Sequence, residues 1–110
     1  MLWKCSVCGL MKGGTDEAPK QCDCGAPAEK FNALSEEELK RNQEMDRAND
    51  IHMEIINLTM RITDLAKRGI ALNVDPSCVA LFKQVHFDAW AIKRRSKAEI
   101  ASHVNKGKWN

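Results

Sequence analysis

The chain has 110 residues and a net charge of +2, with 29% charged and 44% hydrophobic residues, which is typical of a folded domain. No apolar run reaches the ~18 residues of a membrane span, and the N-terminus lacks the apolar core of a signal peptide. We therefore expect neither a membrane protein nor a secreted one. The basic excess is confined to residues 93–110, and no nucleic-acid-binding motif accompanies it, which argues against nucleic acid as a partner.

Residues 1–34 contain four of the five cysteines, interspersed with glycine and proline, and show no helical period. A module of fewer than ~40 residues usually needs a metal, disulfides or a partner to fold. Clustered cysteines in a protein without a secretion signal favour a metal over disulfides, because the cytoplasm is reducing. We predict a cytoplasmic protein in which one metal ion is bound by Cys5, Cys8, Cys22 and Cys24.

Two segments of this module match a known pattern. Trp3-Lys4-Cys5-Ser6-Val7-Cys8-Gly9 fits an aromatic-x-C-x-x-C-G start, and Cys24-Gly25-Ala26-Pro27-Ala28-Glu29-Lys30-Phe31 fits the matching end. The loop between them has the expected Gly14, Asp16, Glu17 and Pro19. Residues 1–34 thus resemble the rubredoxin-like domain found at the end of rubrerythrins. This resemblance implies a small knuckle-and-loop fold in which four thiolates hold one iron that carries one electron.

The second cysteine pair departs from the family pattern. The family places two residues, one usually proline, between these cysteines, whereas only Asp23 separates Cys22 from Cys24, and Gln21 stands at the expected cysteine position. The shorter turn is not expected to offer the sulfurs the same backbone N–H groups, which help to set an iron potential. Zinc has no redox demand and tolerates such a turn, so one iron or one zinc ion are alternatives.

The rest of the chain carries no second metal centre and no catalytic set in this reading. A di-iron site needs Glu-x-x-His pairs, but Glu54 is followed three residues later by Asn57, and Glu99 by Ser102. No nucleophile–base constellation is visible, so we expect no enzymatic activity. The fifth cysteine, Cys78, falls on an apolar helix stripe, where a lone cysteine is expected to be a small core side chain.

A first long helix is predicted over residues 35–68. Ser35 and Glu38 form a capping box at its start, and Gly69 is placed to stop it. Apolar residues along it repeat at spacings of four and three, the pattern of a helix-pairing seam: Ile51, Ile55, Leu58, Ile62 and Leu65. We expect this seam to pack against a second helix.

The second helix is predicted over residues 76–105, with Asp75 as N-cap, Pro76 at its first position and Gly107 after its end. Its stripe is Cys78, Leu81/Phe82, Val85, Ala89, Ile92, Ser96, Ile100 and His103. Two long helices joined by a short loop predict an antiparallel hairpin. The chain is thus expected to be mainly α, with a rubredoxin-like or zinc-ribbon-like metal module at 1–34 and a helical hairpin at 35–110.

Large apolar residues remain outside these two stripes: Ile56, Met60, Phe87 and Trp90. A two-helix hairpin cannot bury them, so we expect a homodimer, or docking to a larger protein, through this face. Two functions are open. In the first, the protein is an electron-transfer accessory or subunit with iron at its cysteines. In the second, it is a structural zinc-binding adaptor or oligomerisation module without a redox role.

Overall fold

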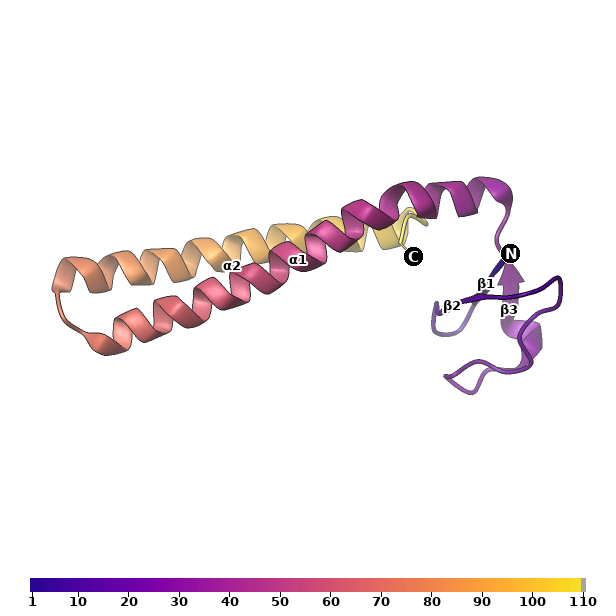
Figure 1. The fold of residues 1–110 in the computed structure, drawn as a ribbon, viewed down its shortest axis with the longest axis horizontal. Coiled ribbons are helices and arrows are strands. Elements are labelled where there is room, and N and C mark those ends of the chain that lie inside the picture. The colour runs from indigo at the N-terminus through magenta and orange to yellow at the C-terminus, as the bar shows by residue number, and fades with distance from the viewer. Residues whose placement is uncertain (110) are drawn as a thin grey trace. The chain divides into compact units, whose positions relative to one another are not determined.

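The computed structural model describes residues 1–109, and within this range it is mainly α, with a small N-terminal sheet followed by two long helices (Figure 1). The chain divides into two compact units, Met1–Met45 and Asp46–Trp109. The first unit holds the sheet and the start of the first helix. The second holds the rest of that helix and the whole of the next. The predicted fold class is confirmed.

The sheet is antiparallel, with strand order β2-β1-β3. It is built from β1 (Leu2–Cys5), β2 (Met11–Gly13) and β3 (Phe31–Ala33), and a short 3-10 helix (Ala28–Lys30) precedes β3. The central strand pairs Trp3 with Lys12 on one side and Cys5 with Phe31 on the other. β1 is hydrogen-bonded to both other strands and ends at Cys5, so the sheet fixes the position of the first cysteine.

Helix α1 (Glu36–Leu72) begins where the capping box predicts. The Glu38 N–H donates to the Ser35 Oγ at 3.1 Å, and the Ser35 hydroxyl donates to the Glu38 carboxylate at 3.2 Å. The predicted stop at Gly69 is wrong, because the helix continues through it to Leu72. The chain leaves the helix at Asn73, whose positive φ of 50° is one that asparagine tolerates.

Helix α2 (Pro76–Asn105) has the predicted bounds. The Asp75 carboxylate accepts from the Ser77 N–H at 3.4 Å and from the Ser77 hydroxyl at 3.1 Å. At the other end, the N–H groups of Gly107 and Lys108 donate to the carbonyls of Val104 and His103, which is the Schellman arrangement. The helix is therefore closed at both ends by local hydrogen bonds.

The predicted seam of α1 is not what pairs the two helices. Ile51, Leu58 and Leu65 are 58%, 48% and 58% exposed, and Ile62 is also exposed. The buried residues of α1 in this unit are instead polar or small. Asn49, Thr59 and Ala66 lie on an adjacent stripe, whereas Gly69, four residues after Leu65, continues the line of the seam and is buried beside the Phe82 ring. Of the apolar residues expected to be left over, Ile56 is half-buried on the adjacent stripe, whereas Met60 and Phe87 are exposed.

Small side chains explain this choice of stripe. On α2 the buried residues are Ala89, Ser96 and His103, as the predicted stripe required, although its Leu81 and Ile92 are exposed. A Cβ placed on Gly69 would lie 2.5 Å from the Phe82 ring, so the ring occupies the space that this glycine leaves. Small residues at a helix contact leave room for a ring from the facing helix, as Gly69 does for Phe82.

A polar pair ties the helices at the opposite end of the hairpin. The buried His103 Nδ1 lies within hydrogen-bond distance of the Asn49 Oδ1, and the Asn49 side-chain amide donates to the Lys108 carbonyl at 3.0 Å. Outside this contact, the His103 Nε2 lies 3.2 Å from the Glu99 carboxylate. Both polar atoms of the Asn49 side chain are therefore satisfied although the residue is only 3% exposed.

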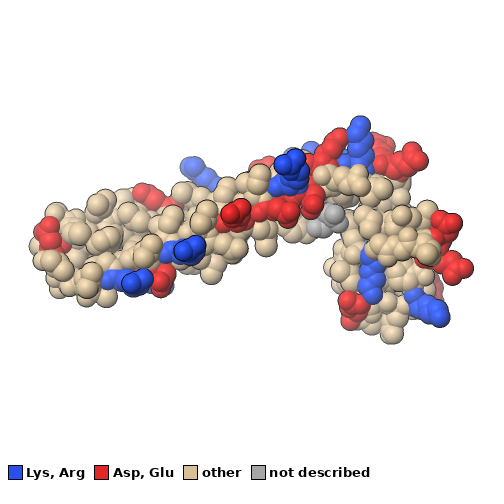
Figure 2. All heavy atoms as spheres, in the orientation of Figure 1, with Lys and Arg blue, Asp and Glu red and all other residues tan. Residues whose placement is uncertain are grey.

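The hairpin leaves many uncharged side chains at its surface. Figure 2 shows mostly uncharged atoms on the visible part of the hairpin near the loop between α1 and α2. Neither long helix in residues 1–109 contains a stretch apolar enough to cross a membrane.

Substitution of Gly69 tests the close approach of the helices. Alanine favours a helix over glycine by about 1 kcal/mol, so an exposed helical glycine would gain stability from Gly69→Ala. Here the new Cβ would clash with the Phe82 ring, and we expect a net loss of about 1–3 kcal/mol, measured by thermal or urea unfolding. In a Phe82→Ala background the same substitution should cost less. Equal costs in both backgrounds would contradict this packing.

Candidate metal centre

The first cysteine pair lies on a tight turn at the end of β1. The Cys5 N–H donates to the Leu10 carbonyl and the Gly9 N–H to the Cys5 carbonyl, both at 2.9 Å. Gly9 has a φ of +80°, a conformation that side chains rarely adopt. The turn folds back so that the Leu10 N–H donates to the Cys8 Sγ at 3.4 Å. This geometry presents both sulfurs on one side of the turn.

The second pair lies on a turn of the same design that is one residue shorter. The Cys22 N–H donates to the Ala26 carbonyl and the Gly25 N–H to the Cys22 carbonyl, again both at 2.9 Å. Gly25 follows the second cysteine with a φ of +91°, as Gly9 does in the first turn. The second turn therefore accommodates the single residue between Cys22 and Cys24 by closing its hydrogen bonds over one residue fewer. The glycine after the second cysteine is the same in both turns.

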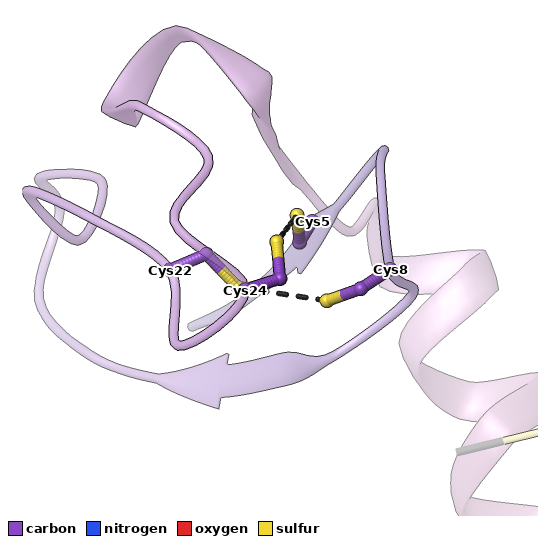
Figure 3. A group of neighbouring side chains, drawn as sticks. All are labelled: Cys5, Cys8, Cys22 and Cys24. Carbon is purple, nitrogen blue, oxygen red and sulfur yellow. Dashed lines mark hydrogen bonds between the residues drawn. The ribbon is translucent and has the colours of Figure 1, made fainter.

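The four sulfurs converge on one point from these two turns (Figure 3). All four Sγ atoms lie within 4.8 Å of one another. The Sγ atoms of Cys8 and Cys22 are 3.5 Å apart, and those of Cys5 and Cys24 are 3.8 Å apart. A tetrahedral ion with metal–sulfur bonds of about 2.3 Å needs sulfurs about 3.8 Å apart, so the cluster has the dimensions of a four-thiolate site.

The cysteines are also the core of their module. Cys5 and Cys22 are buried together with Ala26 and Phe31, and Trp3 and Ala18 pack against them. Cys8 and Cys24 are exposed, so the cluster has a buried side and a solvent-facing edge. With so few apolar side chains around the sulfurs, the folding of this module depends on what binds them.

Backbone hydrogen bonds distinguish the thiols. The N–H of Cys8, helped by that of Val7, lowers the pKa of Cys5 to about 7 against the opposing effect of burial. The N–H of Cys24 lowers the pKa of Cys22, but burial and thiol contacts with Cys8 outweigh it, so this pKa is raised. Cys5 thus has two backbone donors where Cys22 has one, which is the expected consequence of the shorter turn.

At Cys24 the balance resembles that at Cys22. The N–H of Ala26 lowers the pKa of Cys24, whereas burial and the thiol of Cys22 raise it, and the net shift is upward. In the metal-free protein these two thiols keep their protons at neutral pH. A metal ion must therefore displace protons from the second turn when it binds.

A salt bridge fastens the shortened turn to the sheet. The Lys12 ammonium on β2 lies 2.7 Å from the carboxylate of Asp23, the residue between the two cysteines. This hydrogen bond and the charge of Asp23 raise the pKa of Lys12 against the opposing effect of burial. The sequence analysis did not single out Lys12, because a strand lysine whose partner lies 11 residues away in the sequence carries no local signal.

The predicted ligands are all brought together, and Cys78 is not among them. Cys78 is half-buried on α2, as its stripe position predicts. Comparisons of the chain with protein-family models, curated proteins and solved structures found no match. The finding that stands on geometry is a four-cysteine cluster on a small three-stranded sheet, a metal-binding knuckle.

Serine substitutions test the ligand set. Cys22→Ser should lose the bound metal, because a serine hydroxyl does not provide the thiolate that closes the site. Cys78→Ser, the same change outside the cluster, should keep one metal per chain. Metal content of the purified variants decides this, and metal loss from the Cys78 variant alone would contradict the assignment.

The pKa shifts predict how metal affinity depends on pH. Between pH 7 and 9.0 the metal-free protein holds protons on Cys22 and Cys24, and binding releases them. Apparent zinc affinity should therefore rise by at least about 100-fold per pH unit, and more steeply below the Cys5 pKa of about 7, where the Cys5 proton is displaced as well. Competition with a chromophoric chelator measures this slope. An affinity that does not change with pH would contradict these shifts.

Proposed function

We propose that this protein is a rubredoxin-like electron-transfer accessory that holds one iron at Cys5, Cys8, Cys22 and Cys24. The observation that carries the proposal is the convergence of four sulfurs at the spacing of a tetrahedral four-thiolate centre. When bound, iron in such a centre cycles between the ferric and ferrous states and so stores one electron.

The residues around the cluster have distinct roles in this proposal. Cys5 and Cys22 hold the site from the core of the module, where water is excluded. Cys8 and Cys24 lie at the surface, so an electron enters or leaves through their sulfurs when a partner docks on that edge. Backbone N–H groups that point to the sulfurs stabilise the extra negative charge of the reduced centre.

The proposal assigns the chain a carrier role rather than an enzymatic one. It also assigns the protein to the cytoplasm, because a reducing compartment keeps clustered cysteines available as metal ligands. The helical hairpin is the part that joins the module to a second copy or to a larger protein, because many large apolar residues are exposed on it.

A specific observation supports a second candidate, a structural zinc adaptor. The shortened turn gives Cys22 one backbone donor where Cys5 has two. Fewer N–H groups at a sulfur make the reduced, more negative iron centre less favourable. Zinc undergoes no redox change and needs only the four thiolates, so it would fold the module without carrying electrons.

The two candidates are separated by the metal that the protein takes up. The full chain is produced with iron and zinc both available, and its metal content and visible spectrum are recorded. Electron transfer predicts a red protein with one iron per chain that bleaches on one-electron reduction and regains its colour in air. The matched Cys22→Ser variant should be colourless. A colourless wild-type protein with one zinc per chain would overturn the redox proposal in favour of the adaptor.

A further inference from the structure

The apolar stripe of α1 that was predicted to pair the two helices is left mostly exposed by the intramolecular packing. We name it the α1 seam and define it as Ile51, Ile55, Leu58, Ile62 and Leu65. Ile55 is half-buried and the other four are exposed. Apolar side chains at spacings of four and three form a continuous row along one face of the helix. Such a row can interlock with the matching row of a second helix.

We propose that the α1 seam pairs with the α1 seam of a second copy of this chain, antiparallel and centred on Leu58. This inference deepens the partner part of the proposed function, and it does not depend on which metal the cysteines bind.

The seam is nearly symmetric about its centre. When one copy is turned end for end around Leu58, Ile51 meets Leu65 of the second copy. Ile55 and Ile62, three and four residues from Leu58, meet with an offset of one residue. Each apolar residue therefore faces an apolar residue, with a leucine pair at the two-fold axis. Such self-complementarity is the requirement for a closed two-fold dimer.

Charge along the open flank of the seam favours the same arrangement. The other flank is occupied, because Thr59 and Ala66 are buried where α1 meets α2. On the open flank, Glu54 and Arg61 follow Ile51 and Leu58 by three residues, and both are exposed. Antiparallel pairing sets Glu54 of each copy against Arg61 of the other, which gives two opposite-charge contacts.

The outer flanking positions bring Arg47 toward Arg68 of the second copy. These residues lie at the ends of the seam, and both are exposed, so solvent and salt screen their repulsion to the same degree as the attraction between Glu54 and Arg61. A parallel dimer is disfavoured for a different reason. It would direct Glu54 toward the flank that α2 already covers.

The opposite face of the hairpin is less suited to a second copy. A groove of about 650 Å³ there is lined by Ile70, Phe87 and Trp90, but also by Lys67, Lys83 and Arg94. The Lys93 ammonium lies 4.4 Å from the Trp90 ring centroid and covers part of this ring. A two-fold dimer through this face would bring the cations of each copy together, at a cost in like-charge repulsion.

On α2, the residues that share the spacing of Leu81 and Ile92 include charged ones. Asp88, Arg95 and Glu99 interrupt this row and are exposed. The α1 seam has no charged residue among its five members. The antiparallel contact is therefore assigned to α1 against α1.

The first test compares two matched substitutions in the full-length, metal-loaded protein. Leu58 and Met60 are 48% and 53% exposed, on different faces of α1. Sedimentation equilibrium at roughly micromolar to tens of micromolar concentration, the range for a modest interface, should show a wild-type dimer. Leu58→Glu should be monomeric and Met60→Glu dimeric, with equal helical circular dichroism. A monomeric wild type, or dissociation by Met60→Glu and not by Leu58→Glu, would overturn the proposal.

The second test addresses the antiparallel register by charge exchange. Glu54→Arg and Arg61→Glu should each weaken the dimer, by about tenfold or less, since each creates two like-charge contacts at an exposed flank. The double variant carrying both changes should restore the wild-type dissociation constant. A double variant as weak as either single variant would contradict the register. Because these measurements report association alone, they can fail while the metal assignment stands, and the metal assignment can fail while they succeed.

Discussion

The N-terminal module depends on one constraint: four sulfurs must be held within 4.8 Å of one another. Thiolates at this distance repel one another. Burial and contacts with neighbouring thiols also raise the pKa values of Cys22 and Cys24 in the metal-free protein. A divalent or trivalent cation at the sulfurs would remove the repulsion and cross-link the two turns. Since the same cysteines supply much of the module's core, ligation and folding are the same event in free-energy terms.

The second unit is stabilised in a different way. Its helices are closed by local hydrogen bonds at Asp75 and Gly107 and pair through small residues, none of which involves a metal. Thr59, Ala66 and Ala89 are buried in this unit, although small side chains such as these bury little apolar area each. Larger aliphatic side chains are left on the surface, where a partner helix can cover them.

The sequence predicted the parts whose signals are local. Cysteine spacing identified all four members of the cluster, and the Ser35 and Asp75 caps placed the starts of both helices within one residue. It misplaced the helix-pairing stripe, because a heptad of Ile and Leu marks an apolar face without saying which helix covers it. Gly69 was misread for a related reason. A glycine near a helix end resembles a stop, and only the position of the Phe82 ring shows that it serves packing.

Two contacts between α1 and α2, one at each end of the hairpin, hold the α1 seam in a fixed position at the surface. We call these contacts the two anchors. Asn49 and His103 fix the helix register at one end through buried hydrogen bonds, which any slip would leave unsatisfied. Gly69 and Phe82 fix it at the other end by shape, because the ring occupies the space that a Cβ on residue 69 would fill. The α1 seam lies between these anchors on a helix that cannot rotate to bury it. A surface held in this way loses little conformational entropy when a second helix docks, so a modest apolar area is enough to hold a dimer.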